Sequence, residues 1–207
     1  MTEPWEINRE GFPQDPAGYA MLGWTKWAML QENHGLPIDP EKLPSSKDLK
    51  SPMLWLSHSV ALTEAALVLL RVEPGFENMP SDLRGIADTQ YCAVALMLVG
   101  YSLEVCLKAM LILQKGTETY IESEKVYQHH QLTRLADFIF DLTTKDKAIL
   151  ALLTHFTSWA GRYPDPGTKR HQWHEEVFRI ADKNRVAAKD LFKLAAKVQG
   201  HIRKLID

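Results

Sequence analysis

The chain has 207 residues, a length that suits one domain or one domain with an extension. A hydrophobic fraction of 45% and a charged fraction of 24% are typical of a globular protein and exclude wholesale disorder. The formal net charge of −2 does not by itself predict a polyanionic partner.

The N-terminal quarter is rich in proline. Residues 1–16 and 35–51 each contain three prolines, so we expect an irregular arm and a connector on either side of a helix over 17–32. The first six residues are acidic and have no apolar run after a basic start, which argues against a signal peptide and predicts a cytoplasmic protein. We take residues 1–51 as an N-terminal arm, helix and connector.

Residues 52–207 carry helical signals throughout and no period-two strand pattern. The apolar run within 86–115 is interrupted by Glu104 and Lys108, which favours a core helix of a soluble protein over a membrane span. The sequence therefore predicts an all-α fold, an up-and-down helical bundle with an N-terminal helical extension. The helices expected in this part cover 52–73, 86–115, 130–142, 145–160, 170–182 and 185–206, with a polar connector over 116–129.

Glu104 and Lys108 lie one turn apart in the most apolar of these helices. This orientation favours an ion pair, and we expect a structural polar pair at the rim of the buried face. If the next helix returns antiparallel, Arg134, Asp137 and Asp141 could extend the pair into a network.

Three stretches carry a resemblance: "LEVCLKAML" around the Glu-x-x-x-Lys pair, "HHQLTRLADF", and "WAGRYPDPG" before the last helices. Together they resemble the HEPN superfamily over residues 52–207. The resemblance implies an all-helical domain, a homodimer, and a nucleotide-binding module or a metal-independent ribonuclease. Because many relatives act in toxin–antitoxin systems, it also implies a possible antitoxin-like protein partner.

The ribonuclease branch of that superfamily uses an Arg, four to six intervening residues and a His. The His acts as acid and base, and the Arg stabilises the charge on the phosphate. No pair here has that spacing: Arg170 and His174 are separated by three residues, and Arg162 and His171 by eight. These two pairs are the candidate catalytic residues, and the departure from the pattern puts ribonuclease activity in doubt.

Cations and aromatic residues alternate in "RYPDPGTKRHQWHEE", which contains Arg162, Lys169, Arg170, His171 and His174. Such a stretch can bind phosphates and stack on bases. The alternative is a solvated, proline-stiffened loop in which Arg162 pairs with an acid and the aromatic rings pack against the core. A metal site at His171, His174 and Glu175 lacks an obvious further ligand, so we expect neither a metal nor a cofactor.

The last third of the chain is basic: residues 144–207 hold 13 Lys and Arg against 7 Asp and Glu. Arg185, Lys189 and Lys193 recur every four residues and form either a solvated face or a surface that contacts phosphates. The leading hypothesis is a binding module for RNA or nucleotides with no membrane association. The alternatives are a degenerate ribonuclease and a structural homodimer that uses its tryptophans and N-terminal arm for contacts.

Overall fold

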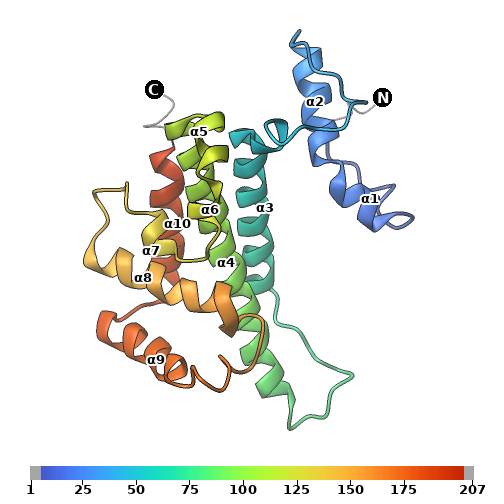
Figure 1. Cartoon of the computed structure of the whole chain (residues 1–207). Helices are drawn as coiled ribbons and strands as arrows, with labels where there is room; N and C mark the ends of the chain where they lie inside the picture. The colour runs from blue at the N-terminus through green and yellow to red at the C-terminus, as the bar shows by residue number, and fades with distance from the viewer. Residues whose placement is uncertain (1–5, 203–207) are drawn as a thin grey trace. The chain divides into compact units, whose positions relative to one another are not determined.

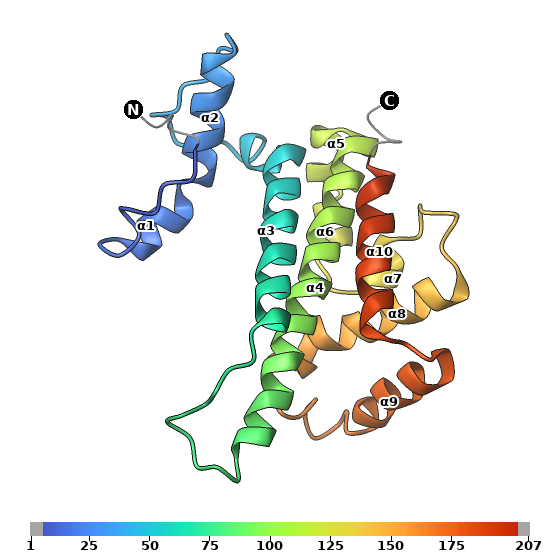
Figure 2. The same cartoon turned by 180° about the vertical axis from the view of Figure 1, so that it is seen from behind.

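The computed structural model describes residues 6–202 (Figures 1 and 2). The chain divides into two compact units, Met1–Leu54 and Trp55–Asp207. The described residues form helices and turns and contain no strand, which confirms the predicted all-α helical bundle.

The N-terminal unit contains two short helices where the sequence predicted one. These are α1 (Pro16–Met21) and α2 (Gly23–Asn33), followed by a 3₁₀ turn, η1 (Asp48–Lys50). Asp15 caps α1, since its Oδ1 accepts the Gly18 N–H at 2.8 Å. Within the described part of this unit the only buried apolar side chain is Ala28. The unit therefore has almost no core of its own.

The second unit is built around one long helix. Its helices are α3 (Pro52–Arg71), α4 (Arg84–Lys115), α5 (Thr117–Glu122), α6 (Glu124–Tyr127), α7 (Leu132–Leu135), α8 (Thr144–His155), α9 (Gln172–Asn184) and α10 (Ala188–His201). In both views α3, α4 and α10 run side by side, and α8 crosses α10 and α4 (Figures 1 and 2). The predicted helix over 185–206 extends into residues 203–207, which lie outside the described part.

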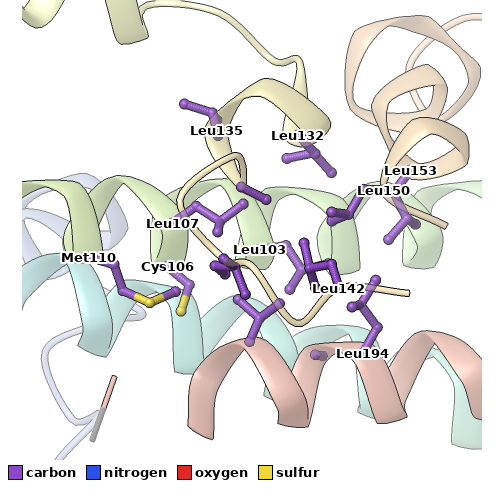
Figure 3. Close-up of a cluster of buried hydrophobic side chains, with 14 of the residues drawn as sticks. Leu103, Cys106, Leu107, Met110, Leu132, Leu135, Leu142, Leu150, Leu153 and Leu194 are labelled. Atoms are coloured by element: carbon purple, nitrogen blue, oxygen red, sulfur yellow. The ribbon is translucent and has the colours of Figure 1, made fainter. Parts of the chain in front are cut away.

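The C-terminal half of α4 is the centre of the core. Leu103, Leu107 and Met110 are fully buried there, among leucines from three other helices (Figure 3). The surrounding leucines are Leu132 and Leu135 of α7, Leu150 and Leu153 of α8, and Leu194 of α10. Burial on several sides of the helix accounts for the absence of charge over 99–103, whereas the preceding residues 92–98 are mostly half-buried and Cys92 is exposed.

The segment between α4 and α8 differs most from the sequence prediction. The expected connector 116–129 contains helices α5 and α6, and the expected helix 130–142 is reduced to the single turn α7. Tyr120 of α5 is buried and stacks on Tyr127 at 5.3 Å between ring centroids. Burial of these two rings outweighs the polar composition that suggested a loop.

Helix α8 starts at a capping box, in which Thr143 Oγ1 accepts the Asp146 N–H at 3.1 Å and Asp146 Oδ2 accepts the Thr143 N–H at 2.9 Å. The helix continues into a π-helical turn, η2 (Phe156–Ala160), closed by the Gly161 N–H to the Phe156 carbonyl at 3.2 Å. A Cβ on Gly161 would lie 2.4 Å from Met97 Cβ. Glycine therefore lets this turn lie directly against α4.

Within residues 6–202, two helices are long and apolar enough to cross a membrane by length and composition, α3 and α4. Their most apolar windows have mean hydropathies of 1.6 and 1.9, and 11% and 61% of the residues in those windows are buried. Most of the α4 window is buried inside the protein, whereas α3 presents apolar side chains, among them Val60 and Val68, at the surface.

Candidate functional site

A pocket of about 460 Å³ lies between the N-terminal half of α4, the turn η2 and the start of α9. Four aromatic residues, Phe156, Trp159, Tyr163 and Phe178, line it together with Arg162 and His174. An apolar pocket with a few polar groups is the usual form of a small-ligand site.

The π-helical turn positions the cationic side of this pocket. Directly after it, the N–H groups of Arg162 and Tyr163 donate to the Trp159 carbonyl at 2.8 and 2.9 Å. The Arg162 guanidinium lies over the Tyr101 ring of α4, 5.7 Å from its centroid. The exposed Arg162 is therefore held against α4 and does not project from a loose loop.

His174 reaches the same pocket from the first turn of α9. Its ring lies 5.2 Å from the ring of Phe178 and 6.5 Å from that of Trp159. Arg162 and His174 belonged to different candidate pairs in the sequence, and the structure brings them to one pocket.

The other candidates in the loop lie outside this pocket. Arg170 is exposed and stacks on Trp173, with its guanidinium 4.7 Å from the ring centroid. His171 is exposed just before α9, and Lys169 precedes it in the same exposed loop. Neither candidate pair, Arg170 with His174 or Arg162 with His171, lines the pocket together.

The basic residues of the last third occupy a different surface. Lys189 and Lys193 are exposed on α10, and Arg185 ends α9 in the left-handed conformation at φ 47°. Two nearby lysines are engaged in ion pairs, Lys145 with Asp190 at 2.6 Å and Lys197 with Asp146 at 2.9 Å. The other basic side chains of this surface, Arg185, Lys189 and Lys193, are exposed.

A second polar group, which we call the Glu104 cluster, consists of Glu104, Lys108, His130 and Tyr101. Glu104 is buried, and its Oε1 and Oε2 lie 2.8 Å from Lys108 Nζ and 2.8 Å from His130 Nδ1. The predicted ion pair is therefore present. It lies deeper than the expected rim, since the side chains of Glu104 and Lys108 are only 7% and 13% exposed.

The partner that extends this pair is His130, not a side chain of the returning helix. The connector before α7 brings the His130 ring to the Tyr101 ring at 5.9 Å between centroids. Arg134, one of the expected partners, instead donates to Gln131 Oε1 at 3.2 Å. Sequence reasoning missed Tyr101 and His130. The spacing of Tyr101, Glu104 and Lys108 along one helical face was a usable signal. His130 lies in the stretch "HHQLTRLADF" that carries the resemblance, but the sequence did not indicate its contact with Glu104.

Burial and neighbouring charges shift the pKa values of several side chains near the site. The pKa of Tyr101 is raised chiefly by burial, an effect that Glu104 reinforces and Arg162 opposes. The pKa of His129 is lowered, first by burial and then by the positive charges of Arg134 and Lys108. The pKa of His155 is also lowered by burial, against a smaller opposing effect of Glu176.

Among residues 6–202 no group of three or more His, Cys, Asp or Glu side chains is placed to hold a metal ion, and this includes His171, His174 and Glu175. The arrangement of the site is that of a cationic, aromatic pocket beside a buried carboxylate. Its chemistry suits anions attached to planar rings.

No family model, curated protein sequence or solved structure matches this chain. The resemblance to the HEPN superfamily therefore remains a prediction that rests on the three sequence stretches given above. Any functional assignment depends on the geometry of the pocket and of the Glu104 cluster.

Proposed function

We propose that this protein is a HEPN-like helical module that binds RNA or nucleotides at the pocket beside Arg162. The observation that carries the proposal is the meeting of Arg162 and His174 at one pocket with aromatic walls. A base would lie among the aromatic rings, and its phosphate would contact the guanidinium.

The interactions available in such a site are those by which proteins bind single-stranded nucleic acids. Each base stacked on an aromatic side chain contributes about 1–3 kcal/mol. The guanidinium adds planar, bidentate hydrogen bonding to phosphate, and exposed lysines add attraction that salt weakens. Lys189 and Lys193 on α10, with Arg185 before them, would supply that longer-range attraction.

Fluorescence anisotropy with a labelled ten-nucleotide RNA tests the proposal. We expect saturable binding at about 50 mM salt, where phosphate contacts are strongest, and a weaker complex as salt rises. Arg162→Ala should reduce affinity about tenfold, in line with loss of a charged hydrogen bond. Arg71→Ala, which removes an exposed arginine at the end of α3, is the matched control. Absence of binding at low salt overturns the proposal.

Ribonuclease activity is the second candidate, and the convergence of Arg162 with His174 favours it. An arginine and a histidine at one pocket are the groups that metal-independent phosphodiester cleavage needs. Incubation with RNA would compare His174→Ala with His171→Ala, because only His174 lines the pocket. Cleavage that survives His174→Ala would exclude this assignment.

Homodimer formation is a further proposal, favoured by the apolar surface of α3. Val60 and Val68 lie two turns apart on that helix and are 53% and 56% exposed. A second copy of the chain would cover them. Light scattering should give twice the monomer mass for the wild type and the monomer mass for Val60→Glu. Val126→Glu, at a similarly exposed valine of α6, serves as the control, and a monomeric wild type would contradict the proposal.

A further inference from the structure

Tyr101 connects the pocket to the Glu104 cluster. Its ring contacts the Arg162 guanidinium at 5.7 Å and the His130 ring at 5.9 Å, both measured between centres. The Tyr101 hydroxyl donates to the Thr157 carbonyl in the π-helical turn at 3.2 Å, which fixes the ring between α4 and η2. Arg162 and His130 thus flank one ordered ring, although they are far apart in the sequence.

The carboxylate of Glu104 determines which nitrogen of His130 faces outward. Glu104 Oε2 lies 2.8 Å from His130 Nδ1, and a carboxylate oxygen only accepts hydrogen bonds. Whenever the ring is neutral, the proton therefore lies on Nδ1 and Nε2 is an acceptor. The His130 side chain is 45% exposed, whereas Glu104 is 7% exposed. The ring is oriented from inside the protein, and its acceptor nitrogen is directed away from the carboxylate.

The charge around this nitrogen suits a polyanion that also carries a hydroxyl donor. Lys108 lies 2.8 Å from the other oxygen of Glu104, so this buried acid is already balanced. The pKa of the neighbouring His129 is lowered chiefly by burial and then by Arg134 and Lys108, whereas Glu104 acts in the opposite direction. Arg162 lies across Tyr101. Cationic side chains thus lie near the His130 ring, and a neutral acceptor beside such cations matches a ribose hydroxyl next to a phosphate.

We infer that His130 is a specificity-determining residue that distinguishes RNA from DNA, through a hydrogen bond from a ribose 2′-OH to its Nε2. Arg162 would contact the neighbouring phosphate, and Glu104 is the positioning residue for the imidazole. His130 does not line the pocket that Arg162 lines, so the ligand must extend over Tyr101. The ligand class is therefore a single-stranded RNA segment of at least two nucleotides, not a free mononucleotide. This inference rests on the proposed function.

The substitution His130→Asn removes the group proposed to recognise the ribose but keeps the hydrogen bond to Glu104. The asparagine amide can occupy the place of Nδ1 and still donate to Glu104, but it provides no group at the place of Nε2. The buried carboxylate thus keeps its partner while the outward acceptor is lost. His58→Asn, at an exposed histidine of α3, is the matched control.

The experiment measures anisotropy of labelled ten-nucleotide uridine and deoxyuridine strands at pH 8, where an imidazole is ordinarily neutral. We expect the wild type and His58→Asn to prefer the ribose strand about fivefold, the value of one net hydrogen bond. His130→Asn should bind both strands equally, with the deoxyribose affinity unchanged. Uridine monophosphate should compete only weakly.

Equal affinity of the wild type for both strands, or a ribose preference that survives His130→Asn, overturns the inference while the proposed function stands. Failure to bind either strand overturns both. Nitrogen-15 histidine spectra give an independent measurement: His130 should carry its proton on Nδ1 in the free protein, and its Nε2 signal should shift on addition of the ribose strand. An Nε2-protonated ring would also contradict the inference.

Discussion

The Glu104 cluster and the loop over residues 162–171 both combine basic side chains with aromatic rings, yet they differ in burial. In the cluster the carboxylate is buried, and its two oxygens lie 2.8 Å from Lys108 Nζ and 2.8 Å from His130 Nδ1. In the loop Lys169, Arg170 and His171 are exposed. A high density of charged residues in a sequence therefore does not indicate an organised site. Two charges in an apolar helix form the better-defined site.

The largest effect should come from breaking the buried pair. Lys108→Met removes the ammonium from Glu104 Oε1 and should lower the free energy of unfolding by about 3 kcal/mol, because it leaves a buried carboxylate poorly compensated. Urea unfolding monitored by circular dichroism measures the change. The double variant Glu104→Gln/Lys108→Met should recover most of the loss. If Lys108→Met changed the free energy of unfolding by less than about 0.5 kcal/mol, the pair would contribute no more than an ordinary surface ion pair.

A smaller effect should follow from filling the close contact between η2 and α4. Gly161→Ala places a Cβ 2.4 Å from Met97 Cβ and 3.0 Å from the Ala93 carbonyl oxygen. We expect a loss of about 1–3 kcal/mol, the usual range for overpacking. Weaker RNA binding should accompany it, since the same turn positions Arg162.

Gly200→Ala is the control for that substitution, because no atom lies within 4 Å of the added Cβ. In α10 it should stabilise the protein by about 0.5–1 kcal/mol. If Gly161→Ala behaved in the same way, the contact between the turn and α4 would be looser than the structure indicates.

Acidification should lower the stability of the protein through partly buried histidines, of which His155 is the clearest case. The pKa of His155 is lowered by burial, and its Nδ1 accepts the Trp159 indole N–H at 3.3 Å. At pH values between the pKa of His155 in the folded protein and the ordinary histidine pKa near 6.5, the unfolded chain binds more protons than the folded chain. The full contribution of His155 to the free energy of unfolding is therefore present above about pH 6.5 and is lost as the pH falls. Thermal unfolding at pH 7.5 and 5.5 should show this decrease, and His155→Gln should make it smaller. If His155→Gln left the decrease in stability unchanged, that decrease would come from other titratable groups.

The sequence allowed the fold class and the long helices to be predicted, because α4 and α10 have strong apolar patterns that packing reinforces. It also allowed the Glu104–Lys108 pair to be predicted from i,i+4 spacing. It did not allow His130 or the pocket to be predicted. His130 reaches Glu104 through a connector that contains the buried Tyr120, and the pocket is lined by a π-helical turn that Gly161 permits. Both are products of tertiary packing that local propensity does not encode.

The smallest effect on stability should come from the exposed loop. Lys169→Ala removes a solvated charge and should leave the free energy of unfolding within about 0.5 kcal/mol of the wild type. If this lysine contacts a phosphate, the same substitution should reduce the slope of log affinity against log salt concentration by about 0.7, the value for one contact with a single strand. Anisotropy titrations at several salt concentrations measure that slope. An unchanged slope would assign Lys169 to the solvated surface, and the loop would then act through Arg162 near its start, the residue that α4 holds in place.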